Sequence, residues 1–225
     1  HGGARAEDSG GNLVTWVYAP DPVVLSNLCG ATGAVTVIFK VTDDCGNSAT
    51  TTATFTIRDI TPPTWTAPAA NKTVECDGSG NAAELSAWLA DHGGARASDV
   101  CGGVTWSFSP DPAILSDGCG STGSVTVVFS ATDACGNTST NTASFIIADT
   151  TPPVLHTNPI CIYLSEYGTW ALDKPNIQRL TENTTDNCSD YDAITFSIVP
   201  LSYDCNDVLK EKMVTVLATD GCGNT

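Results

Sequence analysis

The sequence repeats itself with a period of about ninety residues. Residues 14–63 and 104–153 align at an offset of 90, and 30 of these 50 positions are identical. A third, more divergent copy contains TFSIVP, Cys205 and VTVLATDGCGNT. Such self-similarity is typical of domains strung in series and not of a single enzyme fold. We expect about two and a half periods of a longer array. Its units are residues 1–60, 61–150 and 151–225, of which only the second is whole.

Each repeat contains two segments in which apolar and polar residues alternate, as in half-buried strands. In the second repeat these segments flank the turn at Thr132–Asn137, which predicts a β-hairpin. Asp133 can bond back to the backbone of this turn, and Gly136 or Asn137 can take a positive φ. The residues expected to face the core are Val125, Val127, Phe129, Ala131, Ala143, Phe145 and Ile147, and in the first repeat Val35, Val37, Phe39, Val41, Ala53, Phe55 and Ile57.

A short helix is expected between early strands. Asn81 can cap it, Glu84 stands three residues later as in a capping box, and Trp88 lies on the apolar face. Gly93 is placed to end it. The segment after Asp173 has the same character in the third repeat.

The predicted elements describe an all-β protein. Charged residues make up only 15% of the chain, while 20 Gly and 12 Pro supply turns. The linkers that start at Asp59 and Asp149 contain paired prolines, which hold the chain extended. We expect tandem Ig-like antiparallel β-sandwich domains in a linear array, each with a short helix between early strands.

The charge balance excludes several classes of partner. Nine Lys and Arg face 25 Asp and Glu, for a formal net charge of −16. A nucleic-acid or anionic-membrane surface needs a basic cluster, which this chain lacks. The longest apolar runs, such as Val125–Phe129, are too short to span a bilayer. We expect no nucleic acid and no membrane insertion in this segment.

Ten cysteines at recurring positions predict an oxidising location, extracellular or at the cell surface. A zinc site is the competing explanation, but no CxxC or CxxH spacing supports it.

The copies leave two disulfide pairings open. The first repeat has Gly10 or Gly11 where the second has Cys101, and this loss favours Cys76–Cys101 and Cys119–Cys135. However, the strand between Cys119 and Cys135 is roughly 33 Å long, and a disulfide needs Cα atoms within about 7 Å. Cys101–Cys119 and Cys188–Cys205 are favoured instead, because each pair spans an up-and-down segment whose ends are expected to meet, and this leaves Cys76–Cys135 and Cys161–Cys222. Cys29 is then left to pair upstream or with another chain.

Aspartates near the unit junctions could supply oxygen ligands for Ca²⁺ between adjacent domains. The candidate ligands are Asp43, Asp59, Asp133 and Asp149. Turn chemistry is the competing explanation, since an aspartate in a TDxCGN tip needs no metal and no DxDxDG loop is present. No cofactor is required.

Candidate glycosylation sites are the sequon residues Asn71, Asn137, Asn183 and Asn187, together with Thr150, which lies in a triplet resembling a bacterial O-glycosylation signal. Threonine-rich strands also produce such triplets by chance.

No catalytic constellation is present in the sequence. The three histidines, His1, His92 and His156, belong to no HExxH or G-x-S-x-G motif. Trp16 and Trp106 lie in predicted strands, where core packing is favoured over sugar stacking. Trp65, beside a linker, is the tryptophan to test for exposure.

The sequence contains the motifs TPP, VEC, NAAELSAWL, DVCGGVTW, CGSTGSVTVVFSATDACGN and ASFIIADTTPP. They resemble the HYR-like, Ig-like repeats of large surface adhesins from Bacteroidetes-type bacteria, and the third copy resembles a sister subtype. The resemblance covers essentially the whole chain. The resemblance implies export, tandem arrays and roles in adhesion, surface filaments or gliding, and it supplies no catalytic residue.

We therefore expect a non-enzymatic extracellular structural protein, a segment of an adhesin shaft or an extracellular filament. Its expected partners are neighbouring repeats or subunits, with surface glycans as a further candidate. The alternative is a carbohydrate-binding or spacer module of a secreted polysaccharide-acting protein, which would present a row of exposed aromatic residues. If the outer repeats truly lack strands, an exposed sheet edge would also invite strand donation from a neighbour.

Overall fold

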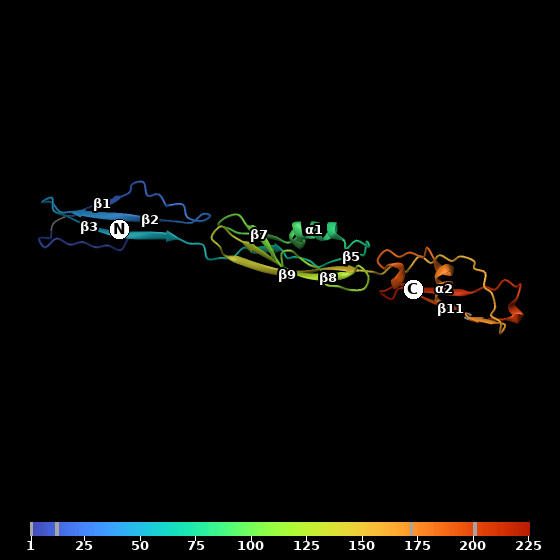
Figure 1. Ribbon diagram of the computed structural model, residues 1–225. Coiled ribbons are helices and arrows are strands. Elements are labelled where there is room, and N and C mark those ends of the chain that lie inside the picture. The colour runs from blue at the N-terminus through green and yellow to red at the C-terminus, as the bar shows by residue number, and fades with distance from the viewer. Residues whose placement is uncertain (1, 12–13, 172, 200–201) are drawn as a thin grey trace. The chain divides into compact units, whose positions relative to one another are not determined.

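The computed structural model describes residues 2–11, 14–171, 173–199 and 202–225, and its regular structure is mostly β-strand with two short α-helices (Figure 1). Contacts divide the chain into two units. The first comprises His1–Pro68, Ala95–Ser107 and Phe129–Asn141, and the second comprises Ala69–Gly94, Phe108–Val128 and Thr142–Thr225. Each unit therefore contains one junction between consecutive repeats.

The first repeat forms one antiparallel sheet in the order β1-β2-β3. Its strands are β1 (Thr15–Ala19), β2 (Gly33–Thr42) and β3 (Ser48–Ile57). Thr15 pairs with Thr42 at one end of β2. The chain after β1 then continues along β2 to its other end, where the Ser26 amide donates to the Ala34 carbonyl at 2.8 Å. The two ends of this excursion are thus separated by most of a ten-residue strand.

The second repeat contains two sheets. One pairs β4 (Thr64–Ala67) with β6 (Arg96–Ser98) in antiparallel fashion. The other has the order β5-β9-β8-β7 and is built from β5 (Lys72–Glu75), β7 (Thr105–Ser109), β8 (Gly123–Thr132) and β9 (Thr138–Ala148). Strand β5 runs parallel to β9, so this sheet is mixed where a purely antiparallel one was expected.

The predicted core of the second repeat is confirmed. Val127, Phe129, Ala131 and Phe145 are all 0% exposed, and the other predicted positions are also buried. Trp88 covers this face, with its ring centroid 5.6 Å from that of Phe145. Burial of such apolar side chains stabilises the repeat by roughly 1.5–3 kcal/mol each.

The matching face of the first repeat is more open. Phe55 is 60% exposed and Ile57 is 37% exposed, although both occupy positions equivalent to core residues of the second repeat. In the second repeat Trp88 from the helix covers this face, and residues 1–60 contain no counterpart of that helix.

Both predicted helices are present. Helix α1 spans Ala82–Ala90, but Asn81 makes no side-chain cap and takes φ 49°, so the predicted capping box is wrong. The Asn81 side-chain amide instead donates to the Glu75 carbonyl at 2.9 Å. The 3₁₀ segment η1 (His92–Gly94) follows, with Gly93 at φ 65°. Helix α2 (Lys174–Thr181) is capped by Asp173, whose carboxylate accepts from the Asn176 amide.

The third repeat has short strand pairs. Strand β10 (Thr169–Ala171) pairs with β12 (Ser202–Asp204), and β11 (Thr195–Val199) pairs with β13 (Thr215–Thr219). The 3₁₀ segments η2 (Tyr191–Ala193) and η3 (Cys205–Asp207) lie beside them in sequence. Among the described residues, no helix has both the length and the apolar character needed to cross a membrane.

Candidate functional site at the repeat junctions

The TDxCGN tip of each repeat is a turn closed by its aspartate. In the second repeat the Asp133 carboxylate accepts from the amides of Cys135 (2.8 Å) and Asn137 (2.9 Å). Gly136 takes φ 89°. Burial by itself raises the pKa of Asp133, but hydrogen bonds from the Asn137 side chain and from these backbone amides outweigh burial and lower it. The predicted turn is thus confirmed, and of the two candidates Gly136 adopts the positive φ.

At the first junction, the tip of the second repeat contacts the linker that leads into it. The Asn137 side-chain amide donates to the Asp59 carbonyl at 3.3 Å. The backbone of the first repeat also reaches across, because the Ala31 amide donates to the Cys101 carbonyl at 2.8 Å. A disulfide between Cys29 and Cys135 joins the two repeats, with the Cα atoms 5.0 Å apart.

The second junction repeats this arrangement one period later. The Asn224 side-chain amide donates to the Asp149 carbonyl at 3.2 Å, and the Ser121 backbone amide donates to the Cys188 carbonyl at 3.3 Å. Cys119 is bonded to Cys222. Each contact is the counterpart of one at the first junction, so the junction is a repeated structure.

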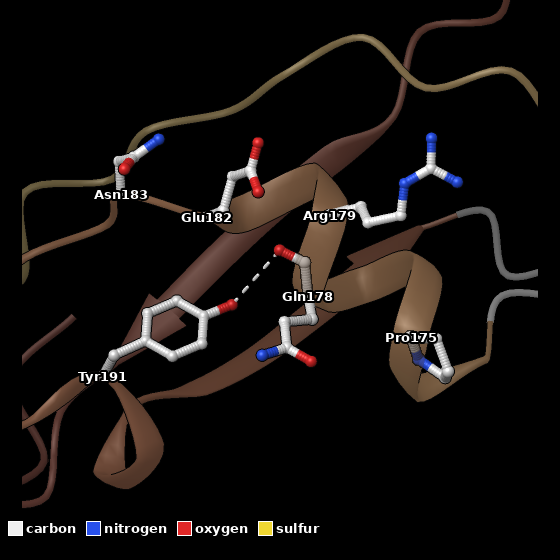
Figure 2. A pocket seen from close by; sticks show the side chains of 6 residues that line it. All are labelled: Pro175, Gln178, Arg179, Glu182, Asn183 and Tyr191. Atoms are coloured by element: carbon white, nitrogen blue, oxygen red, sulfur yellow. Dashed lines mark hydrogen bonds between the residues drawn. The ribbon is translucent and has the colours of Figure 1, made fainter.

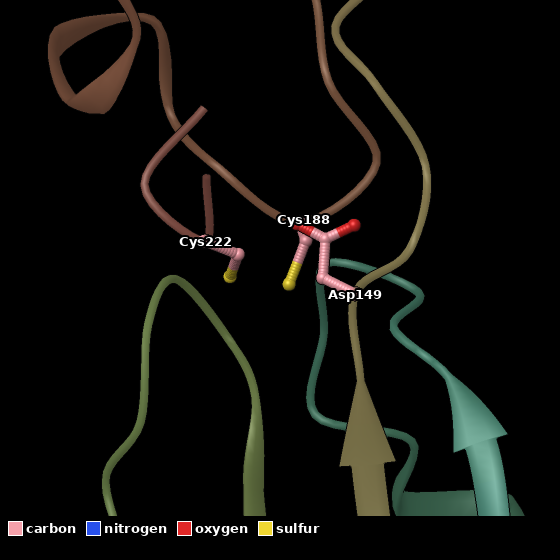
Figure 3. Close-up of side chains that lie close together, drawn as sticks. All are labelled: Asp149, Cys188 and Cys222. Atoms are coloured by element: carbon pink, nitrogen blue, oxygen red, sulfur yellow. The ribbon is translucent and has the colours of Figure 1, made fainter. Parts of the chain in front are cut away.

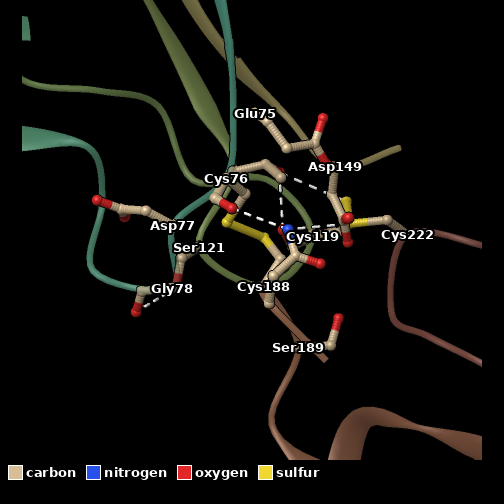
Figure 4. Close-up of a disulfide and its surroundings, with 12 residues drawn as sticks. Glu75, Cys76, Asp77, Gly78, Cys119, Ser121, Asp149, Cys188, Ser189 and Cys222 are labelled. Atoms are coloured by element: carbon tan, nitrogen blue, oxygen red, sulfur yellow. Dashed lines mark hydrogen bonds between the residues drawn. A yellow bond between two sulfur atoms is a disulfide. The ribbon is translucent and has the colours of Figure 1, made fainter. Parts of the chain in front are cut away.

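A further disulfide, between Cys76 and Cys188, strengthens the second junction (Figure 4). The Asn187 side-chain amide donates to the Cys76 carbonyl at 2.8 Å beside it. Figure 3 shows Cys188 and Cys222 close to Asp149. Two bridges therefore meet at this junction.

The predicted disulfide pairing is wrong. Of the eight cysteines assigned to bridges, five form bridges with other partners, and Cys101, Cys161 and Cys205 are free, as is Cys45. The reason lies in the excursion after β1 and its counterpart after β7. This segment was expected to return to its start, but it runs on along the neighbouring strand, which places its two cysteines at opposite ends of that strand. Cys29, expected to pair outside this chain, is bonded to Cys135.

Carboxylates gather at both junctions. Asp149, Asp186 and Asp220 each offer an oxygen within 4.8 Å of the others. At the first junction Asp59 forms one such group with Asp99 and Cys101, and another with Asp133 and Cys135. The Oδ2 atoms of three of these side chains are buried without a hydrogen-bond partner among the described residues, namely those of Asp59, Asp149 and Asp186.

Burial and nearby negative charges shift the pKa values of two groups at the junctions, Asp149 and Cys101. Burial raises the pKa of Asp149, and the charges of Asp186 and Asp220 raise it further. Burial likewise raises the pKa of the Cys101 thiol, and so do the charges of Asp59 and Asp99. Each group is harder to ionise because it is partly buried and because its neighbours carry negative charge.

Three of the four predicted calcium ligands lie at these junctions: Asp59, Asp133 and Asp149. Asp43 closes the tip of the first repeat and belongs to no such group among the described residues. The prediction missed Asp99, Asp186 and Asp220. A signal for them exists, since Asp99 and Asp186 both stand two residues before a cysteine, and Asp220 is the tip aspartate of the third repeat.

The second linker is held by Glu75 at the end of β5. Its carboxylate accepts from the Thr150 amide (2.8 Å), the Thr150 hydroxyl (2.9 Å) and the Thr151 hydroxyl (2.8 Å). These donors, the Thr150 amide first, lower the pKa of Glu75. The threonines of the TPP linker therefore fasten it to the sandwich before the prolines begin.

The candidate glycosylation residues differ in their surroundings. Asn71 and Asn183 are exposed. The Asn137 amide nitrogen donates to both Asp59 and Asp133, and a glycan there would replace one of these hydrogens. The Asn187 amide and the Thr150 hydroxyl are likewise engaged. Modification at these sites stays a prediction, with Asn71 and Asn183 the least obstructed.

The remaining candidate residues form no catalytic arrangement in the described part of the chain. His92 lies in η1, His156 lies in the third repeat, and His1 lies outside the described residues. Trp65, the tryptophan to test for exposure, is half-buried, and its ring lies 5.7 Å from that of Trp106.

A surface hollow lies beside α2 (Figure 2). It is lined by Pro175, Gln178, Arg179, Glu182, Asn183 and Tyr191. The Tyr191 hydroxyl is shared between the Thr181 hydroxyl and the Gln178 carbonyl, and so is committed to the fold.

No known family model matches the chain. No curated protein matches it significantly. The resemblance to HYR-like repeats therefore rests on the sequence motifs alone.

Similar solved structures are protocadherin fragments. A cis-dimer structure of protocadherin gammaB7 EC3-6 has a TM-score of 0.32 and 12% identity, and the match covers 92% of this chain and 65% of that one. Protocadherin Gamma B2 extracellular cadherin domains 1-5 gives 0.33 and 15%, over 84% of this chain and 42% of that one. The chain thus spans less than two thirds of either, and such a likeness transfers no function, ligand or partner.

Proposed function

We propose that this chain is a segment of a non-enzymatic extracellular structural protein, in which Ig-like repeats in series carry load as the shaft of a surface adhesin or the body of a filament. The observation that carries the proposal is that the disulfides connect consecutive repeats. Each of the three joins a cysteine of one repeat to a cysteine of the next. Disulfides persist in oxidising surroundings, which supports a place outside the cell.

The bridges overlap along the chain, and this overlap supplies the mechanism. A covalent route runs from Cys29 directly to Cys135, back along the chain to Cys119, and on to Cys222. Tension applied to the two ends is borne by this route. The hairpin of the first repeat, helix α1 and most of the third repeat lie in the bypassed segments. They are therefore shielded from extension even if they unfold.

Single-molecule stretching of the oxidised chain tests the proposal. The covalent route limits the oxidised chain to about a fifth of the length that the reduced chain reaches at ~3.5 Å per residue. We expect full extension to appear only after a reductant is added. An oxidised chain that extends as far as the reduced chain would contradict the load-bearing role.

A second part of the proposal is a divalent cation at the junctions, with Ca²⁺ as the best match. The donors are carboxylate oxygens, which suit hard cations. The buried, unpartnered Oδ2 atoms of Asp149 and Asp186 support it, because a buried carboxylate oxygen without a partner is costly. An ion held by Asp149, Asp186 and Asp220 would tie the linker to the third repeat.

A further inference from the structure

The three disulfides follow one rule of register. The cysteines of a repeat occupy four positions in chain order, which are Cys76, Cys101, Cys119 and Cys135 in the second repeat and Cys161, Cys188, Cys205 and Cys222 in the third. The first repeat supplies only the third and fourth positions, Cys29 and Cys45.

In each bridge, an odd position bonds to the even position that follows it, one repeat later. Cys76 at the first position bonds to Cys188 at the second position of the next repeat. The other two bridges both run from a third position to a fourth: Cys29–Cys135 and Cys119–Cys222. The sequence separations are 112, 106 and 103 residues, so every bridge spans a little more than one period.

The four free cysteines are the ones for which this rule places a partner outside residues 1–225. Cys45 and Cys101 occupy even positions and require odd-position cysteines about one period upstream. Cys161 and Cys205 occupy odd positions and require even-position cysteines about one period downstream. The rule accounts for all ten cysteines, whereas pairing within repeats accounts for neither the bridges nor the free thiols.

The free thiol of Cys101 has the same kind of surroundings as its disulfide-bonded counterpart, Cys188. Its thiol lies within 4.8 Å of carboxylate oxygens of Asp59 and Asp99. Its counterpart Cys188 has the same relation to Asp149 and is bonded to Cys76. The carbonyls of Cys101 and Cys188 each accept a hydrogen bond from a backbone amide of the preceding repeat. The other free thiols, those of Cys45, Cys161 and Cys205, are exposed.

We propose that these four thiols bond to adjoining repeats of the same kind, so that every junction of the assembled protein carries two disulfides. Cys45 bonds to a third-position cysteine and Cys101 to a first-position cysteine, each in the repeat that precedes its own, and Cys161 and Cys205 bond to the second- and fourth-position cysteines of the repeat that follows theirs. The inference rests on the proposed function as a repeat array. In each bond two thiols lose two protons and two electrons, and a disulfide oxidant accepts them and becomes two thiols.

Peptide mapping of native protein tests the proposal, with free thiols alkylated before any reduction. We expect each of the four cysteines to be joined to a cysteine of the stated position in another repeat. If Cys205 is joined to Cys45, the neighbour is a second copy. If the partner peptides carry related motifs from beyond this sequence, the neighbour is a further repeat of the same polypeptide. Alkylated thiols, or bonds such as Cys45–Cys101, would overturn the proposal.

The isolated 225-residue chain provides a second measurement. After refolding in a glutathione buffer, it should hold three disulfides and four thiols that react with a thiol reagent. Replacing all four free cysteines with serine should preserve the three bridges and the circular dichroism spectrum. A monomer without reactive thiols would overturn the register rule. The stretching limit depends only on the internal bridges, so it can stand even if the external ones fail.

Discussion

A Cβ atom added to Gly30 would overlap the carbonyl oxygen of Cys101, in the next repeat. Gly30 has φ +53°, and the Ala31 amide that follows donates to the same carbonyl. One period later, Gly120 has φ +56° and the same relation to Cys188. A side chain at either position would overlap a carbonyl oxygen and would require a strained backbone. Glycine is therefore required for consecutive repeats to come this close to each other.

Gly30→Ala should therefore open the first junction. The left-handed backbone costs an alanine about 1–2 kcal/mol, and loss of the Ala31–Cys101 hydrogen bond costs about 0.5–1.5 kcal/mol more. We expect the equilibrium constant for the Cys29–Cys135 bond in a glutathione buffer to fall at least about tenfold, since tenfold corresponds to 1.4 kcal/mol. Gly103→Ala is the control, because Gly103 has no atom within 4 Å of an added Cβ and is not among the positive-φ glycines. Equal bond formation in the two variants would refute the close approach.

Removing one bridge should lengthen the load-bearing route in a calculable way. In Cys29→Ser the shortest covalent route passes through Cys76–Cys188, and the limiting extension rises from about a fifth to about a half of the reduced length. Cys45→Ser is the matched control, because Cys45 is free in this chain. Stretching single molecules of both variants measures the two limits. An unchanged limit in Cys29→Ser would mean that Cys29 does not bridge the repeats.

Calcium should stabilise the second junction through Asp149. Millimolar Ca²⁺ is expected to raise the melting temperature of the wild type and not that of Asp149→Asn. Without calcium the variant should melt at the same or a higher temperature, because burial and the neighbouring charges raise the pKa of Asp149 and make its carboxylate unfavourable. Asp43→Asn, at a tip outside the carboxylate groups, should respond to calcium as the wild type does. Melting curves unchanged between Ca²⁺ and EDTA would exclude the junction ion.

The sign of the pH effect at Asp149 follows from its raised pKa. The folded state binds this proton more tightly than the unfolded state. As pH rises from the unfolded pKa of 3.8 through the folded pKa, the Asp149 contribution to stability is lost. In the absence of calcium, the stability advantage of Asp149→Asn over the wild type should grow across that window. A difference that is independent of pH would contradict the crowding of the carboxylates.

Glu75 titrates in the opposite direction. Because donors from Thr150 and Thr151 lower its folded pKa, its contribution is present above the unfolded value and is lost as pH falls through the folded pKa. The amide resonance of Thr150, followed by NMR, should titrate with a midpoint below the ordinary value of 4.5. Glu75→Ala should abolish this titration, whereas Glu84→Ala should not alter it. A midpoint at 4.5 or above would show that the linker is not fastened to Glu75.

The sequence was sufficient where local rules decide the structure. Alternation predicted the buried face of β8 and β9, from Val125 to Ile147, because period two determines which side chains share a sheet face. The tip around Asp133 followed from the turn chemistry of aspartate and glycine. Helix α1 was found by its pattern, although Asn81 uses its side chain to join β5 and not to cap the helix.

Long-range contacts were not predictable from a single repeat. The pairing of the cysteines depends on where the segment after β7 ends, and nothing local to Cys101 or Cys119 indicates that it continues along the sheet. The same strand length that argued against Cys119–Cys135 also separates Cys101 from Cys119. The predicted pairs all lie within single repeats, so they could not indicate a junction between repeats. The unpaired Cys29 was nevertheless a signal that disulfides connect one repeat to another.

Disulfide mapping of the oxidised chain, digested without reduction and analysed by mass spectrometry, tests the central claim most directly. The linked peptides should contain Cys29 with Cys135, Cys76 with Cys188, and Cys119 with Cys222, each joining one repeat to the next. Linked peptides that contain Cys101 with Cys119, or Cys76 with Cys135, would place the bridges inside single repeats and contradict the account.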